Sequence, residues 1–265
     1  HLENLGDRDG VLKAKTEIFK FLRPDGHIVL NGDDDKLITV REYNGVKPVF
    51  FGLNSERDVY ADQIESKGLK GVACRIHQGE DAFDVLVPTP GIHMVYNALA
   101  AAAVGRIYGL TIEEIRRGIE SLETIRGRFK MIETDKFLVV DDCYNANPVS
   151  MMASIDVLSQ AKGRKIAVLG DMGELGSEEK KLHGMVGTHF AGKKIDALFV
   201  TGTLAGEIAE EARRVAPETR VYAEPDKEAL EEALLEYRRP GDTILVKASH
   251  FMGFSEIVKK LEQPQ

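Results

Sequence analysis

The chain has 265 residues, of which 43% are apolar and 29% charged, and this composition is ordinary for a soluble globular protein of one large or two smaller domains. The formal net charge of −8 argues against a nucleic-acid-binding face, and no apolar run approaches the roughly 20 residues that a membrane span requires. Cys74 and Cys143 lie far apart in the sequence and predict neither a disulfide framework nor a zinc site. We therefore expect a cytoplasmic protein.

The start of the chain is unusual for a native protein. It begins with His1 rather than Met, and the residues that follow lack the basic and then apolar progression of a signal peptide. We expect the chain to be a fragment or a processed form of a longer protein.

The first half is predicted to combine helices with β-hairpins. Residues 10–22 have the apolar spacing of an amphipathic helix, which Pro24 and Gly26 end. A short strand at 27–30 runs into the acidic segment 31–35, which could hold a metal or form a solvated turn, and the turn is the safer interpretation. Further strands are predicted at 37–40, 46–51, 71–77 and 83–87.

Two helices and a basic turn complete this half. Residues 93–108 are rich in alanine, which predicts a buried helix close to its neighbour and leaves the Asn97 amide in need of partners. Thr111 is predicted to cap a second helix, with Glu114 as its capping-box partner. The segment 126–129, with two arginines around a glycine, predicts either a mobile basic hinge suited to phosphate or an ordinary surface turn.

The second half alternates strands with helices, which is typical of a doubly wound α/β domain with a mostly parallel sheet. The apolar run at 137–140 predicts a buried strand, and further strands are predicted at 165–169, 197–200, 220–222 and 243–246. Helices are predicted near 151–160, 178–190, 205–216, 227–237 and 255–261.

Polar residues follow four of these strands, at 141–142, 170–176, 201–202 and 247–250. Ligands bind at the carboxyl ends of strands in open α/β sheets, so we expect a ligand cleft at this edge. The segment 141–150, D-D-C-Y-N-A-N-P-V-S, is the most crowded of the four and is either a polar turn or part of the site. Ser150 is the predicted cap of the helix that follows it.

Several familiar motifs are absent. The segment 170–176 spaces its glycines as G-x-x-G-x-x-G and carries Asp171 and Glu174 where they would repel a pyrophosphate, so it is not a dinucleotide fingerprint. The sequence contains no G-x-x-x-x-G-K-[ST] phosphate loop, no H-E-x-x-H and no nucleophile elbow. The residues by themselves indicate a two-part α/β protein with a cleft between its parts.

The order and spacing of many separated segments resemble the Mur ligases. The segments that carry this resemblance are H-L-E at 1–3, A-K-T-E-I-F at 14–19, N-G-D-D at 31–34, H-x-x-x-N-A-L-A at 93–100, R-G-R-F at 126–129, the crowded segment at 141–150, G-D-M-G-E-L-G at 170–176 and L-V-K at 245–247. The versions at 141–150 and 170–176 are similar to those of the branch that adds D-alanyl-D-alanine to UDP-N-acetylmuramoyl-tripeptide. The branch that adds the third amino acid typically has D-Y-A-H at 142–145 and a D-N-P-R motif, which this sequence lacks. Folylpolyglutamate synthetases are more distant relatives.

The resemblance implies a three-domain enzyme, of which residues 1–129 would form the later part of the central ATPase domain and 130–265 the Rossmann-like C-terminal domain. The expected fold is therefore a doubly wound α/β domain preceded by an incomplete P-loop-type domain of helices and β-hairpins. The implied enzyme is a monomer that uses ATP and Mg²⁺ to phosphorylate the tripeptide carboxylate, and the D-alanyl-D-alanine amine then attacks the acyl phosphate. The fragment itself is expected to be inactive, because the phosphate loop would lie upstream.

The resemblance also implies roles for individual residues. His1 and a carbamylated Lys15 would act in catalysis and hold magnesium, since carbamylation turns a cation into an anionic ligand. The expected ATP-binding residues are Asn97 at the adenine, Arg128 at the phosphates, Asp142 at the ribose, and Asn145. The expected D-alanyl-D-alanine-binding residues are Asn147, Asp171, Glu174, Lys247 and Ser249. Domain closure about the 126–129 hinge would bring the two groups together.

One departure from the family and two alternatives belong to this interpretation. The family usually has K-G-S-R where this chain has Lys247-Ala248-Ser249-His250, and a histidine does not replace a bidentate arginine. The alternatives are a non-catalytic binding or regulatory protein on the same scaffold, and the ligase that adds the third amino acid. A phosphate loop in the upstream reading frame would favour an enzyme.

Overall fold

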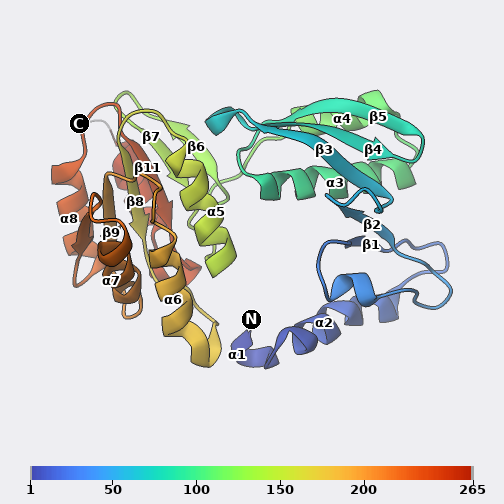
Figure 1. Cartoon of the computed structure of the whole chain (residues 1–265), viewed down its shortest axis with the longest axis horizontal. Coiled ribbons are helices and arrows are strands. Elements are labelled where there is room, and N and C mark those ends of the chain that lie inside the picture. The colour runs from blue at the N-terminus through green and yellow to red at the C-terminus, as the bar shows by residue number, and fades with distance from the viewer. Residues whose placement is uncertain (1, 264–265) are drawn as a thin grey trace. The chain divides into compact units, whose positions relative to one another are not determined.

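The computed structural model describes residues 2–263, and the chain divides into two compact units between Glu123 and Thr124. Among the described residues, none of the helices combines the length and the apolar character needed to cross a bilayer. The predicted α/β class is confirmed, because each unit packs helices against its own sheet (Figure 1).

The first unit contains a five-stranded sheet in the order β1-β2-β3-β4-β5. Its elements are α1 (Leu2–Leu5), α2 (Arg8–Thr16), η1 (Glu17–Phe21), β1 (Val29–Asn31), η2 (Leu37–Thr39), β2 (Val49–Gly52), β3 (Val59–Ser66), η3 (Gly68–Lys70), β4 (Val72–Gln78), β5 (Asp81–Val87), α3 (Ile92–Ile107) and α4 (Ile112–Glu120). Strands β1, β2 and β3 pair in parallel, and only β3, β4 and β5 form antiparallel hairpins. The predicted region of β-hairpins is therefore half right.

One prediction in the first unit is wrong and another is only partly right, both for local reasons. The predicted strand at 37–40 is the short 3₁₀ helix η2, because the Asp34 carboxylate accepts hydrogen bonds from the backbone of Lys36 and Leu37 and closes a turn there. The predicted helix at 10–22 changes from α to 3₁₀ geometry after Thr16, whose hydroxyl donates to the Leu12 carbonyl. Its predicted apolar face is only partly packed: Val11, Leu12, Phe19 and Leu22 are half-buried, whereas Ile18 is 69% exposed.

The acidic segment 31–35 forms a turn. Asp34 accepts from the turn backbone and from Arg8, and Asp33 pairs with Arg57 and accepts from the Tyr96 hydroxyl. These partners account for the charges of the segment, so the interpretation as a turn is confirmed.

Helix α3 covers the sheet of the first unit through its alanine-rich face. Val95, Ala98, Leu99 and Ala102 are buried against strand residues such as Ile76. Helix α4 follows with the predicted capping box, in which Thr111 accepts from the Glu114 backbone and the Glu114 carboxylate accepts from Thr111.

The second unit is a doubly wound domain with the strand order β10-β9-β8-β11-β7-β6. Its elements are β6 (Lys130–Glu133), β7 (Leu138–Asp141), α5 (Pro148–Ser159), β8 (Lys165–Leu169), η4 (Gly176–Glu178), α6 (Glu179–Thr188), β9 (Ala197–Val200), α7 (Ala205–Val215), β10 (Arg220–Ala223), α8 (Lys227–Tyr237), β11 (Thr243–Lys247), η5 (His250–Met252) and α9 (Ser255–Glu262). All neighbouring strands are parallel except the edge strand β6, which the sequence analysis missed. Helices α8 and α9 pack on one face of this sheet, and α5 and α7 cover the other (Figure 1).

The start of α5 corrects the predicted cap. Asn147, not Ser150, is the N-cap: its side chain accepts from the Ser150 backbone, and the Ser150 hydroxyl accepts from the Asn147 backbone. Pro148 occupies the first helical turn, where its fixed φ is favourable and its missing N–H is not needed. Helix α5 therefore begins at Pro148, earlier than the predicted start at residue 151.

Close packing of α6 on α7 depends on Gly187. A Cβ at this position would lie 2.4 Å from the Ile208 carbonyl oxygen, so Gly187→Ala is expected to destabilise the second unit by about 1–3 kcal/mol. Gly206 is a matched control on α7, since a Cβ there meets nothing within 4 Å and alanine should be neutral or stabilise by up to about 1 kcal/mol. Urea unfolding followed by circular dichroism measures both, and equal effects would contradict this packing.

Candidate functional site

Four loops meet at the carboxyl edge of the second sheet. They follow β7, β11, β8 and β9, which are neighbours in that order, and they carry the polar residues that the sequence analysis selected. The expected convergence of these strand ends is confirmed. The hydrogen bonds determine which side chains face a ligand and which hold the loops.

Lys247 lies at the end of β11 and is only 2% exposed. Its ammonium nitrogen is 2.6 Å from Asp142 Oδ2, 3.1 Å from the Asn145 carbonyl oxygen and 3.4 Å from the Asp142 carbonyl oxygen. An ammonium group has three N–H donors, so these three acceptors satisfy it. Lys247, expected to line the acceptor cleft, instead binds the loop that follows β7.

The Asp142 carboxylate joins three elements. Oδ2 accepts from Lys247 and from the Ser154 hydroxyl on α5, at 2.6 and 2.7 Å, and Oδ1 accepts from the Phe129 backbone N–H at 3.1 Å. The side chain retains 15% exposure. The expected ribose partner is therefore held firmly by three hydrogen bonds and remains partly exposed.

The basic turn at 126–129 is attached to the same loop. Gly127 N–H donates to the Asp141 carboxylate at 2.9 Å, and Tyr144 N–H donates to the Gly127 carbonyl at 2.9 Å. Gly127 has a φ of +76°, and a Cβ there would lie 3.1 Å from Tyr144 Cβ, so the turn requires glycine. These bonds attach the turn at 126–129 to the second unit, and its role as a hinge stays a prediction.

An exposed row of basic and aromatic side chains lies over this turn. The Arg128 guanidinium is stacked 4.0 Å from the centre of the Tyr144 ring, and the His250 ring is 5.9 Å from the same ring. Tyr144 is 50% exposed, and both basic side chains are exposed. This row offers positive charge and a flat apolar surface to a ligand.

Asp171 follows β8 and is only 6% exposed. It caps a helix that is distant in sequence. Its two oxygens accept the backbone N–H groups of Thr203, Leu204 and Ala205 at the start of α7, at 2.7–3.0 Å. A carboxylate at the positive end of a helix is favourable. Asp171 thus fixes the loop after β8 to the loop after β9.

Ser249 and His183 hold the rest of the loop after β8. The Ser249 hydroxyl accepts from Gly173 N–H at 2.8 Å, and His183 Nε2 accepts from Met172 N–H at 2.9 Å. Because Nε2 accepts, the proton of His183 lies on Nδ1, which donates to the Glu179 carbonyl at 2.7 Å. Glu174 lies at the tip of this loop, exposed, with a φ of +61° that is unusual for a residue with a side chain.

Sequence reasoning missed two of these residues, Ser154 and His183. Both are polar side chains on the buried faces of helices, Ser154 2% exposed and His183 0% exposed. A polar residue on an apolar stripe needs a partner, and this requirement was the available signal.

Asn145 and Asn147 are exposed. The Asn145 side-chain oxygen accepts from Ala146 N–H at 2.8 Å, and Asn147 caps α5. Their side-chain oxygens therefore shape the loop, while their exposure leaves them accessible to a ligand.

The remaining predicted residues belong to the first unit. Asn97 is exposed on α3, its amide nitrogen is 3.4 Å from the Met94 sulfur, and it lines a mostly apolar cavity of about 340 Å³ between α3 and α4. Lys15 is exposed on α2. His1 lies outside the described residues.

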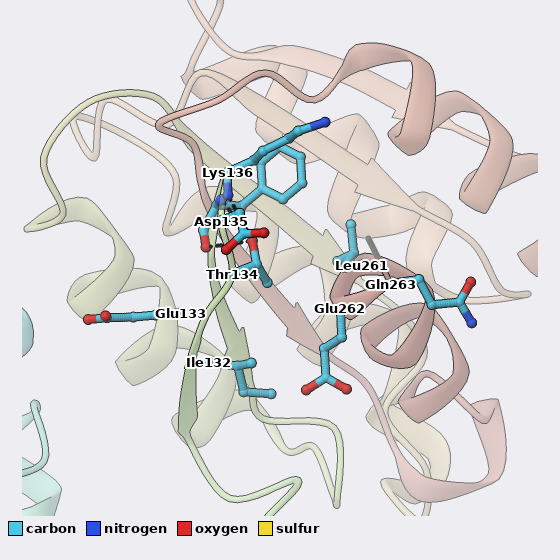
Figure 2. A pocket seen from close by; sticks show the side chains of 9 residues that line it. Ile132, Glu133, Thr134, Asp135, Lys136, Leu261, Glu262 and Gln263 are labelled. Atoms are coloured by element: carbon cyan, nitrogen blue, oxygen red, sulfur yellow. Dashed lines mark hydrogen bonds between the residues drawn. The ribbon is translucent and has the colours of Figure 1, made fainter. Parts of the chain in front are cut away.

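A cavity of about 370 Å³ lies at the opposite end of the second sheet, between the β6–β7 turn and the end of α9 (Figure 2). The side chains drawn in Figure 2 include Glu133, Lys136 and Glu262. None of the predicted site residues lines it, so the carboxyl edge remains the candidate site.

Both parts of the chain match known protein families. Residues 1–105 match the Mur ligase middle domain, and residues 127–250 match the Mur ligase glutamate ligase domain. The chain is 36% identical to the UDP-N-acetylmuramoyl-tripeptide–D-alanyl-D-alanine ligase of Bacillus subtilis over 98% of this chain and 56% of that protein. It is 31% identical to the ligase of the same name from Escherichia coli, over 99% of this chain and 58% of that protein.

Solved structures give the same result. A crystal structure of MurF from Acinetobacter baumannii superposes with a TM-score of 0.84 and 30% identity, over 100% of this chain and 57% of that one. MurF from Thermotoga maritima in complex with ADP gives a TM-score of 0.81 and 26% identity, over 99% of this chain and 59% of that one. The chain thus spans somewhat more than half the length of these relatives.

The helix-capping role of Asp171 predicts a large loss of stability on substitution. Asp171→Asn leaves one acceptor oxygen for three N–H donors, and we expect a loss of about 1–3 kcal/mol in the free energy of unfolding. Asp226 is the matched control: it caps α8 through a single bond to Ala229 N–H, and Asp226→Asn should change stability by less than about 0.5 kcal/mol, since asparagine caps equally well. Chemical unfolding of both variants tests this, and a neutral Asp171→Asn would refute the role.

The two cysteines are expected to be unreactive in the folded chain. Burial and the neighbouring Asp141 carboxylate raise the pKa of Cys143 from 9.0 to about 12, and burial raises the pKa of Cys74 from 9.0 to about 11. A raised pKa favours the protonated thiol, so at pH 8 less than about 0.1% of either is the nucleophilic thiolate. Ellman's reagent should titrate almost no thiol in the native chain and both in denaturant; rapid native labelling would contradict the assignment.

Proposed function

The chain belongs to the Mur ligase family, and on this premise we propose that it is part of an ATP-dependent ligase that joins D-alanyl-D-alanine to UDP-N-acetylmuramoyl-tripeptide. The observation that carries the proposal is that similarity to proteins named for this reaction extends through both units, over 98% of the chain. The chain covers 56% of the Bacillus subtilis relative, so the proposed activity is that of the whole protein.

The proposed reaction has two steps. The tripeptide carboxylate takes the γ-phosphoryl group of ATP and becomes an acyl phosphate, with release of ADP. The neutral amine of D-alanyl-D-alanine then attacks the acyl carbon, and the tetrahedral intermediate breaks its C–O bond to phosphate. One amine proton leaves with the departing group as hydrogen phosphate, and the amide remains. Most of the protein's contribution to such a transfer is positioning and charge stabilisation.

We assign the nucleotide to residues that have polar atoms accessible to solvent. The exposed Asn97 amide can both donate and accept at the adenine edge. The partly exposed Asp142 side chain can accept from a ribose hydroxyl, and the exposed Arg128 guanidinium suits phosphate. Asn145 is exposed beside Asp142 and has a less specific part in this group.

The acceptor dipeptide is assigned to the loops after β8 and β11. Glu174 has the exposed carboxylate that suits an incoming ammonium group before it loses its proton. Asp171, Lys247 and Ser249 are proposed to act indirectly, because their polar atoms hold these loops in place. Asn147 has the corresponding role at the start of α5.

The described residues do not make a complete magnesium site. Of the two predicted ligands, His1 lies outside the described residues and Lys15 is an exposed lysine on α2. Among residues 2–263, no three His, Cys, Asp or Glu side chains are grouped so that they could hold a metal ion. The proposed mechanism therefore assigns no step to a metal held by this part of the chain.

The proposal predicts a specific product from the full-length protein. ATP, UDP-N-acetylmuramoyl-tripeptide and D-alanyl-D-alanine should give ADP, phosphate and the pentapeptide precursor, identified by mass spectrometry. Arg128→Ala should lower kcat/KM by about 100-fold, because phosphate charge loses a stabilising cation. Arg126→Ala is the control in the same turn, and it should change kcat/KM by less than about threefold, since the Arg126 side chain is 64% exposed and pairs with Glu262.

Three results would contradict the proposal. The first is a product made only from a single amino acid, which would indicate the ligase that adds the third residue. The second is no product from the full-length protein with any acceptor, which would favour a non-catalytic scaffold. The third is turnover by the 265-residue chain alone, since its sequence contains no phosphate loop and we propose that it is inactive by itself.

A further inference from the structure

Ser154 is a hydroxyl residue on the buried face of α5. It is 2% exposed, and its neighbours on that face include the fully buried Met151 and Ile155. A hydroxyl in such surroundings requires a hydrogen-bond partner. Two acceptors lie within reach of its Oγ, Asp142 Oδ2 at 2.7 Å and the Ser150 carbonyl oxygen at 2.8 Å.

The single hydroxyl proton goes preferentially to Asp142. Oδ2 carries the charge of a carboxylate, and hydrogen bonds to an ionised acceptor are roughly twice as strong as bonds between neutral groups. The Ser150 carbonyl is one turn earlier in the same helix, and a backbone N–H of the helix also serves it. Ser154 therefore acts as a donor to the carboxylate, together with the Lys247 ammonium at 2.6 Å.

The two oxygens of Asp142 then have different surroundings. Oδ2 receives the two donors just described, both from side chains at most 3% exposed. Oδ1 receives the Phe129 N–H at 3.1 Å, the one donor to it within the part of the chain that the structure describes. A carboxylate oxygen can accept two hydrogen bonds, so Oδ1 has one acceptor position left.

We propose that Ser154 is a positioning residue for the nucleotide: it fixes the rotation of the Asp142 carboxylate so that the open position of Oδ1 meets a ribose hydroxyl. This inference rests on the proposed function, in which Asp142 binds the ribose. Without the Ser154 hydroxyl, the carboxylate plane is held only by Lys247 on Oδ2 and by the Phe129 N–H on Oδ1. Its rotation about the terminal bond, which has a broad torsional preference, is then less restricted. Ser154 itself does not touch the nucleotide.

The test compares ATP with 2′,3′-dideoxy-ATP in the full-length ligase. Ser154→Ala should raise the KM for ATP about five- to tenfold, the size of effect expected for one ordinary hydrogen bond, and leave kcat within about twofold. With dideoxy-ATP the wild-type KM should already be raised, and Ser154→Ala should add no further increase. The readout is the ratio of the KM for dideoxy-ATP to the KM for ATP. Ser154→Ala should lower this ratio, whereas replacement of a purely structural serine would leave it unchanged.

Two further variants make the result interpretable. Ser159→Ala is the matched control, because Ser159 lies on the same helix and donates to the Asp156 carbonyl, away from Asp142; it should leave both KM values unchanged. Ser154→Cys keeps a donor at the same position, a weaker one on a slightly larger side chain, so its KM for ATP should fall between wild type and Ser154→Ala. If Ser154→Ala does not fold, Ser154→Cys is used in its place for the same comparison of KM values.

The outcomes separate this inference from the proposed function. If the wild-type ligase discriminates between the nucleotides and Ser154→Ala shifts both KM values equally or neither, the role of Ser154 is overturned and the proposed function stands. If the wild-type ligase uses both nucleotides equally well, the ribose contact of Asp142 is overturned, and the role of Ser154 with it.

Discussion

Burial of the Lys247 ammonium is the constraint on which the carboxyl edge of the second unit depends. A charged amine that is 2% exposed is costly unless each of its donors is satisfied and an opposite charge lies beside it. The Asp142 carboxylate and two carbonyl oxygens of the same loop meet these needs. The chain after β7 must therefore curl over the end of β11, and this path determines where α5 can begin.

The same principle divides the polar residues of the edge into two groups. Asp141, Asp171 and Ser249 are buried, and each accepts backbone N–H groups from a neighbouring loop, so their hydrogen bonds define the shape of the edge. Arg128 and Glu174 are exposed above them. In the proposed enzyme the buried group positions the exposed group, which is the arrangement expected where binding requires preorganised charge.

The sequence predicted the second sheet better than the first for a physical reason. Strands buried on both faces are continuous apolar runs, and the predicted strands at 165–169 and 197–200 match β8 and β9 to the residue. Strand β3 was missed because its second half is largely exposed and polar, with Gln63 at a φ of +50° where the pairing register shifts. The position of the site was predictable in the same way, from strand ends, whereas the hydrogen bonds were not: the partners of Lys247 lie 102 and 105 residues away in sequence.

The sequence does not show which atom of a site residue can still accept a hydrogen bond. At Asp142 this determines how many ribose hydroxyls the carboxylate can bind in the proposed site. Its Oδ1 holds the Phe129 N–H and has one further acceptor position. A second ribose hydroxyl on Oδ1 would have to displace Phe129, whose backbone belongs to the turn that carries Arg128. Sugar and phosphate contacts of the proposed site therefore share one oxygen. A ribose that takes one bond leaves the Phe129 bond in place, and a ligand that takes two would break it and leave the Arg128 turn held by the bonds of Gly127 to Asp141 and Tyr144.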